Sequence, residues 1–146
     1  MQRLHTCFRF LLSGALAFVL ASMFHTQSVL MKLSQLDISI SLQQKVESIG
    51  VDLLGLAPTY GIVVLVGLAI AFILASQLNR LLLVPKTWIY AVAGGLAMAV
   101  ILLAMKPILN VTLLAGAREL GGFLLQCLAG TLGGLVFGIT AKTQND

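Results

Sequence analysis

The stretch LGGFLLQCLAGTLGGLVFGI, residues 120–139, decides the fold that we predict for this chain. It contains no charged residue, and six of its residues are glycine. In water this much glycine makes a poor helix, because each glycine costs about 1 kcal/mol relative to alanine. In lipid the backbone must satisfy its own hydrogen bonds, so the helix forms and its glycines become contact surface. We therefore predict a transmembrane helix over residues 119–139 that packs closely against its neighbours.

The composition of the whole chain extends this prediction to an integral membrane protein. Of its 146 residues, 59% are hydrophobic and 10% are charged, whereas about 25% of residues are charged in a typical soluble domain. So few charges cannot cover a water-facing surface, and we expect the lipid bilayer to be the main partner. The net charge of +4 is spread along the chain without a basic cluster, which argues against binding to nucleic acid.

Three further apolar stretches predict membrane-spanning helices over residues 8–24, 60–79 and 86–105. Residues 1–146 are therefore expected to form a single all-α membrane domain, a four-helix bundle. The first stretch also fits a cleaved signal peptide, because it has a basic start and small residues near its end, and this alternative stays open. Tyr60, Trp88 and Tyr90 stand near the ends of spans, where aromatic side chains favour the membrane interface.

The longest polar stretch, residues 26–58, is predicted to contain an amphipathic helix between the first two spans. One apolar face is formed by residues that step by four and three: Leu42, Val46, Ile49, Leu53 and Leu56. We expect Pro58 to follow the end of this helix, although the spacing from residue 29 to residue 40 also fits a longer first helix and residues 37–42 also fit a strand. The apolar face predicts a helix on the membrane surface or a docking face for a partner. A second interfacial segment is expected over residues 107–118, after Lys106 and Pro107 end the third span.

Small residues recur at intervals of four in the spans and predict the surfaces on which the helices pack. They are Gly67, Ala71 and Ala75 in the second span, Gly95 in the third, and Gly122, Gly130, Gly134 and Gly138 in the fourth. Gln126 lies on the last of these stripes at mid-span. Because an amide that faces lipid is costly, we expect Gln126 to point into a bundle or across an interface.

Arg118 lies two turns before Gln126 on the same stripe. A charge at a helix end is explained by a side chain that reaches the headgroups, and the alternative is a polar site formed by Arg118 and Gln126. No span has an acidic residue in its interior, and the H-E-x-x-H and G-x-S-x-G motifs are absent. We therefore expect no catalytic residue, no metal and no cofactor, and predict that the protein is not an enzyme.

The distribution of lysine and arginine predicts the orientation of the chain. If the N-terminus lies inside, the inner segments hold Arg3, Arg9, Arg80, Lys86 and Lys142, and the outer segments hold Lys32, Lys45, Lys106 and Arg118. This small excess favours cytoplasmic N- and C-termini. The runs LLGLAPTYG at 53–61 and AGAREL at 115–120 resemble small inner-membrane proteins of proteobacteria. This resemblance implies the bacterial inner membrane.

These patterns lead to one functional expectation and two alternatives. We expect a non-enzymatic accessory or assembly subunit of an envelope complex, which acts through helix–helix association as a homo-oligomer or with another membrane protein. The first alternative is a small oligomeric transporter or channel with a polar site near Gln126 and Arg118. The second is the handling of a lipid or lipid-linked precursor at the outer leaflet, where Lys106 and Arg118 meet its phosphates.

Overall fold

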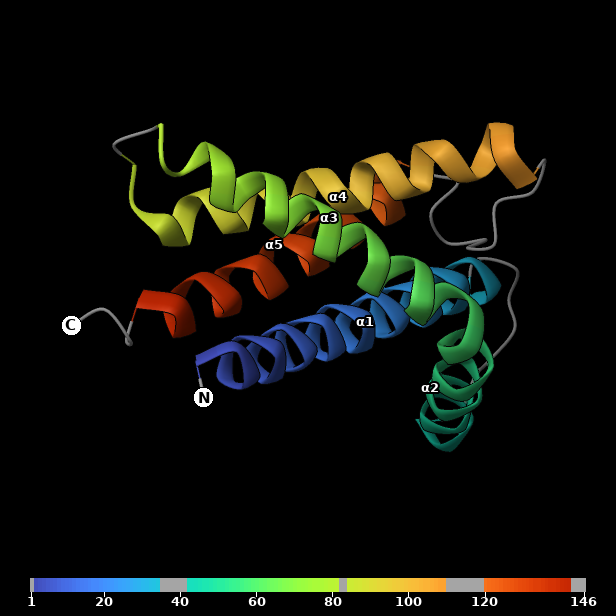
Figure 1. Ribbon diagram of the computed structural model, residues 1–146. Helices are drawn as coiled ribbons and strands as arrows, with labels where there is room; N and C mark the ends of the chain where they lie inside the picture. The colour runs from blue at the N-terminus through green and yellow to red at the C-terminus, as the bar shows by residue number, and fades with distance from the viewer. Residues whose placement is uncertain (1, 35–41, 82–83, 110–119, 143–146) are drawn as a thin grey trace.

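The computed structural model describes residues 2–34, 42–81, 84–109 and 120–142, and these are helical apart from a short turn, with no strand among them. Four of the described helical stretches are long and apolar enough to cross a membrane. The predicted all-α architecture with four membrane spans is therefore confirmed (Figure 1).

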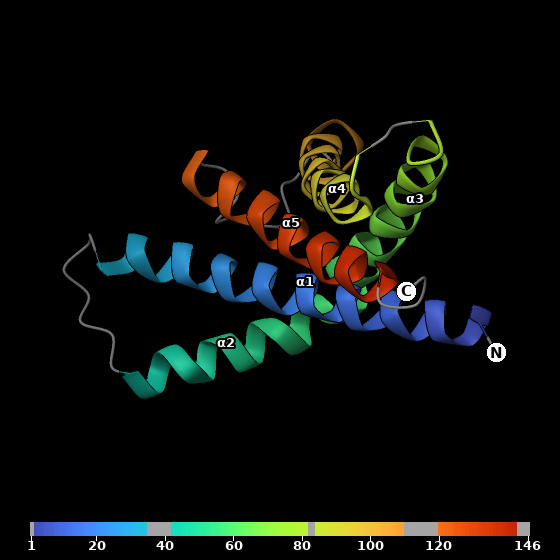
Figure 2. The same cartoon turned by 90° about the vertical axis from the view of Figure 1, so that its left-hand side faces the viewer.

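The four spanning helices are α1 (Gln2–Ser34), α3 (Ile62–Leu78), α4 (Lys86–Leu109) and α5 (Leu120–Lys142). A shorter helix, α2 (Leu42–Leu56), connects the first two spans and leaves the bundle at a steep angle to α3 (Figure 1). Both views place the first turn of α1 and the last turn of α5 at the same end of the bundle (Figures 1 and 2).

Helix α5 is the centre of the bundle. It packs most extensively against α4 and next most extensively against α1, whereas α1 and α3 touch only sparsely. Figure 2 shows α5 lying between α4 and α1. The glycine-rich segment is therefore the helix that joins α4 to α1, whereas α3 packs mainly on α4.

The first helix is longer than its predicted span of 8–24, because residues 26–34 continue α1 instead of beginning the polar stretch. Two of its polar side chains bond to their own helix: Thr26 Oγ1 donates to the carbonyl of Ser22 at 3.0 Å, and Ser28 Oγ donates to that of Phe24 at 2.8 Å. Such bonds let hydroxyl residues stay in a helix, so polarity does not end it. The strand alternative concerns residues 35–41, which lie outside the described residues.

Two prolines do not end helices where the sequence analysis expected. Around Pro58 the chain forms a π-helical turn, Ala57–Gly61, that joins α2 directly to α3. Proline lacks the N–H of a regular helix, and a wider turn accommodates that missing donor while it bends the axis. Pro107 lies inside the last turn of α4, which runs on to Leu109. The rest of the predicted interfacial segment, residues 110–118, lies outside the described residues.

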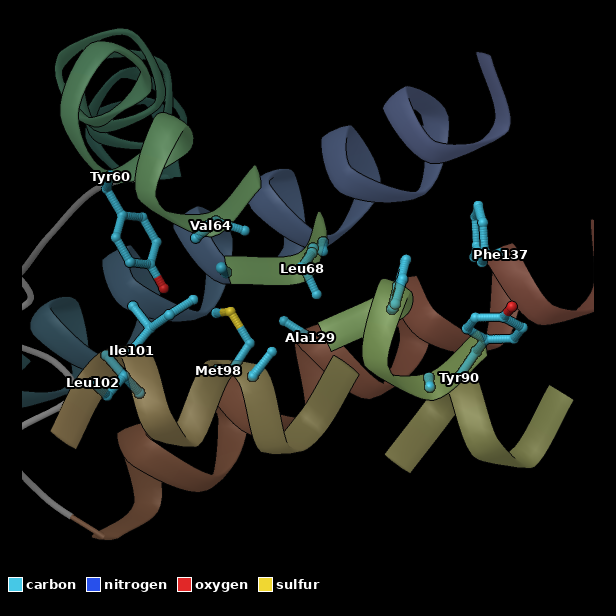
Figure 3. Close-up of a cluster of buried hydrophobic side chains, with 14 of the residues drawn as sticks. Tyr60, Val64, Leu68, Tyr90, Met98, Ile101, Leu102, Ala129 and Phe137 are labelled. Carbon is cyan, nitrogen blue, oxygen red and sulfur yellow. The ribbon is translucent and has the colours of Figure 1, made fainter. Parts of the chain in front are cut away.

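The core consists of two neighbouring groups of side chains (Figure 3). In the first group, Tyr60, Val64 and Leu68 of α3 and its preceding turn lie over Met98 of α4, and all four side chains are fully buried. The second group is aromatic and lies toward the chain termini. It contains Phe10, Phe72, Tyr90 and Phe137, with the rings of Phe72 and Phe137 stacked at 4.7 Å between centroids.

Candidate functional site

Gln126 occupies the polar centre of an otherwise apolar bundle. Its side chain is 1% exposed. Its Oε1 accepts a hydrogen bond of 3.0 Å from the hydroxyl of Tyr60, and its Nε2 donates one of 2.8 Å to the backbone carbonyl of Ala21. The amide therefore ties α5 to α1 and to the turn before α3. With one bond at each end of the amide, Gln126 can hold three segments in a fixed register.

The aromatic residues at the span ends divide into two kinds. Trp88 is 63% exposed and is free to face the membrane interface. Tyr60 and Tyr90 are 0% and 9% exposed, so these two side chains face the interior of the bundle and do not face the lipid headgroups. Tyr60 turns inward because its hydroxyl donates a hydrogen bond to the amide oxygen of Gln126. Tyr90 turns inward to pack edge-on against Phe137, with 4.9 Å between the ring centroids.

One face of α5 packs backbone to backbone against α4. A Cβ on Gly130 would meet the carbonyl oxygen of Gly94, and a Cβ on Gly94 would meet that of Gly130. A Cβ on Gly134 would meet the carbonyl oxygen of Tyr90, and one on Gly138 would lie 2.6 Å from the Cα of Thr87. Only glycine permits this approach. This face is therefore covered by α4 of the same chain.

A second face of α5 packs against α1. A Cβ on Gly133 would lie 2.7 Å from the Cβ of Ala17 and 3.0 Å from the carbonyl oxygen of Ser13. Gly122 is also buried. The side chains that α5 leaves exposed are large and apolar, as with Leu124 at 63% and Ile139 at 56%. The bare side of this helix is turned inward, and its lipid side carries large side chains.

Of the remaining small residues, Gly67, Ala71 and Ala75 lie between α3 and α4, whereas Gly95 faces α5. A Cβ on Gly67 would lie 2.5 Å from Cδ1 of Ile101, and a Cβ on Gly95 would lie 2.5 Å from Oγ1 of Thr131 on α5. Ala71 and Ala75, with Gly67, line a groove of about 570 Å³ between α3 and α4. We call this hollow the α3–α4 groove.

The predicted docking stripe on α2 is only partly covered. Val46 is 65% exposed, while Ile49 and Leu53 are half-buried. The side chains of Leu42 and Leu56 lie outside the described residues. Val51 and Leu54, which the stripe does not include, are 65% and 78% exposed. The apolar surface of α2 is therefore wider than the predicted stripe.

Of the two residues in the predicted polar site, Arg118 and Gln126, the structure describes only Gln126. Arg118 lies outside the described residues, as do the side chains of Lys106 and Lys142. Among the described residues, no group of three or more histidine, cysteine, aspartate or glutamate residues is placed to hold a metal ion. Cys7 of α1 and Cys127 of α5 are both free thiols.

Sequence reasoning missed three contributors to the packing. Gly94 and Gly133 each lie one residue before a glycine of the predicted stripes, Gly95 and Gly134. A second set of small residues, shifted by one position, would have identified them. Tyr60 has no such signal, because no local pattern connects it with an amide 66 positions further along the chain.

The fold and its buried polar centre define the chain as a multi-pass helical membrane protein. Comparison with protein-family models, with curated proteins and with solved structures found no match for this chain.

Proposed function

We propose that the protein is a non-enzymatic subunit of the bacterial inner membrane that works by association with another membrane-spanning helix. Both termini face the cytoplasm in this proposal. The first turn of α1 and the last turn of α5 lie at one end of the bundle, which supports that topology together with the small lysine and arginine excess (Figure 1). The partner helix belongs to an envelope complex or to a second copy of the chain.

The α3–α4 groove is the observation that carries this proposal. Its base is formed by small residues, among which Ala75 and Ala97 are 4% and 8% exposed. Its walls are large apolar side chains that point outward, such as Leu74 at 63% and Leu96 at 61% exposed. Membrane helices associate where small residues let another helix approach closely. The groove therefore offers the contact surface that a transmembrane partner requires.

The glycine stripe of α5 stabilises the bundle itself and does not form the proposed contact with a partner. Gly130, Gly134 and Gly138 are covered by α4 of the same chain, so they stabilise the monomer and are not offered to a partner. The exposed apolar residues of α2, including Val46 and Leu54, provide a second surface outside the bundle. The alternative of a transport path through Gln126 has less support, because both ends of that amide are hydrogen bonded inside the bundle.

Site-specific crosslinking in native membranes tests the proposal. A photoreactive side chain at Val92, which lines the groove and is 57% exposed, should form adducts with protein. The same group at Leu124 on the lipid side of α5 should form adducts with lipid, and serves as the matched control. Ala71→Leu fills the groove and should reduce the protein adducts at Val92 at least threefold.

Protein adducts of equal strength at Val92 and Leu124, or adducts that Ala71→Leu leaves unchanged, would contradict the proposal. The gel-filtration profile of the Ala71→Leu variant establishes that the bundle still folds. The mass of the adduct distinguishes a second copy of the chain from another protein.

A further inference from the structure

A second hollow, separate from the α3–α4 groove, lies between α1 and α3. Its volume is about 660 Å³, which is within the range of about 300–1,000 Å³ for small-molecule sites. The first turns of α1 form one wall and the last turns of α3 the other, while Tyr90 of α4 and Phe137 of α5 also line it. We call this hollow the α1–α3 cavity.

The α1–α3 cavity lies at the depth of the membrane interface. Its α1 wall begins at Thr6, one residue after the start of the apolar span His5–Ser28. Its α3 wall ends at Gln77, one residue before the end of the span Ala57–Leu78. An amphiphile that enters from the bilayer therefore meets the cavity with its head near the headgroup region and its tail in hydrocarbon.

The lining separates apolar from polar chemistry. Four aromatic rings form the inner part: Phe10, Phe72, Tyr90 and Phe137. Phe10 contacts Phe72 edge-on at 6.1 Å, and Tyr90 contacts Phe72 edge-on at 5.5 Å. Hydroxyl, thiol and amide groups supply the polar part, from Thr6, Cys7, Ser76 and Gln77. Among the described lining residues there is no aspartate, glutamate, lysine or arginine, so the site suits an uncharged ligand.

Tyr90 supplies the observation that points to a ligand. Its ring is nine-tenths buried, held by Phe72 and Phe137, and Figure 3 shows its hydroxyl on the side away from Met98. No hydrogen bond to this hydroxyl is found within the described part of the chain. The contrast is with Tyr60, whose hydroxyl bonds to Gln126. The hydroxyl oxygen is not itself enclosed by the described residues, because it is not among the buried polar atoms that lack a partner. Since Tyr90 lines the cavity, its hydroxyl is accessible to a ligand there, and an acceptor on that ligand would supply the missing hydrogen bond.

We propose that the α1–α3 cavity binds a neutral, membrane-soluble amphiphile with a planar ring that bears an acceptor oxygen, of the quinone type. The ring stacks among Phe10, Phe72 and Phe137, as aromatic groups prefer. The hydroxyl of Tyr90 donates a hydrogen bond to the ring oxygen. The tail leaves past Ile73, which lines the cavity and is 63% exposed on the outside of the bundle.

Protection of Cys7 from a maleimide reagent tests this proposal. Cys7 lines the cavity, and Cys127→Ala leaves it as the single thiol of the full-length chain. The protein is placed in phosphatidylcholine nanodiscs, and the probe is a fully substituted benzoquinone with a decyl tail, which cannot add to thiols at its ring. The quinone should slow the labelling of Cys7 at least fivefold at saturation.

Tyr90→Phe should raise the half-saturating quinone concentration about 3- to 10-fold, because it removes one hydrogen bond. It should not lower thermal stability, because the lost hydroxyl has no partner in the described chain. A purely structural role for Tyr90 predicts the reverse result. Tyr60→Phe is the matched control and should leave the half-saturating concentration unchanged.

Two results would overturn the proposal. The first is a labelling rate that the quinone does not change in protein that elutes as a folded species. The second is equal protection by decanol, which has the same tail without the ring and would identify a site for simple acyl chains.

Discussion

The contact between α4 and α5 can be tested by adding one methyl group at Gly134. Gly134→Ala places a Cβ against the carbonyl oxygen and carbon of Tyr90. These are backbone atoms of a helix, so no side chain can rotate to make room. The two helices must move apart along their whole contact, including the neighbouring pair Gly94 and Gly130. The control is Gly121→Ala on the same helix, where a Cβ would meet nothing within 4 Å.

The loss of stability expected for Gly134→Ala is the difference between two opposing effects. Overpacking of a close contact typically costs about 1–3 kcal/mol, and replacing glycine by alanine in a helix returns up to about 1 kcal/mol. Gly134→Ala should therefore lower the free energy of unfolding by about 1–2 kcal/mol. Gly121→Ala carries only the second effect and should be neutral or slightly stabilising. For a chain of this size, about 1–2 kcal/mol corresponds to a midpoint lower by roughly 3–8 °C.

The assay is thermal inactivation in detergent, read by gel filtration. Aliquots are heated, and the fraction that still elutes as a single folded species is followed by the fluorescence of Trp88, the only tryptophan in the chain. The two variants and the original protein are compared under identical heating. If Gly134→Ala withstands heating as well as Gly121→Ala does, α4 and α5 do not approach as closely as described, and the reasoning fails.

Two other perturbations test the polar centre and the π-helical turn. Tyr60→Phe and Gln126→Leu should each destabilise the protein by about 1 kcal/mol, because each leaves a buried group without its partner. The double variant should lose less stability than the sum of the two single losses. Strict additivity in the same heating assay would show that these side chains do not interact. Pro58→Ala restores a backbone N–H and should straighten the junction between α2 and α3, which spin labels at Val46 and Ile73 would report as a longer distance. An unchanged distance distribution would mean that the bend does not depend on proline.

The sequence was sufficient for the spans because length and apolar character are local properties. It was also informative about α5, since the glycine repeat and the mid-span amide together imply a helix that is buried on one side. The same reasoning could not assign the partners. Two glycine registers overlap in the segment 130–138, and which one meets α4 and which meets α1 depends on how the other helices are placed.

The prolines show a different limit. A proline predicts the loss of one hydrogen bond, yet whether the helix stops or bends depends on what lies beyond. After Pro58 the apolar residues of α3 continue the helix into the bundle. Because their burial favours a continuous helix, the chain bends at Pro58 and does not end there. Tyr60 illustrates the third limit, because its inward position follows from Gln126, a residue that lies far along the chain and close only after folding.

The central place of α5 has a consequence for biosynthesis. Residues 120–142 leave the ribosome after the earlier helices, so α1 and α4 enter the bilayer before the helix against which both pack most extensively has been made. Until α5 has been made, the hydroxyl of Tyr60 lacks the acceptor that Gln126 provides, whereas the carbonyl of Ala21 keeps its bond within helix α1. A nascent chain truncated before α5 would therefore leave the hydroxyl of Tyr60 without its acceptor within the membrane, and this unsatisfied group would distinguish incomplete copies from complete ones.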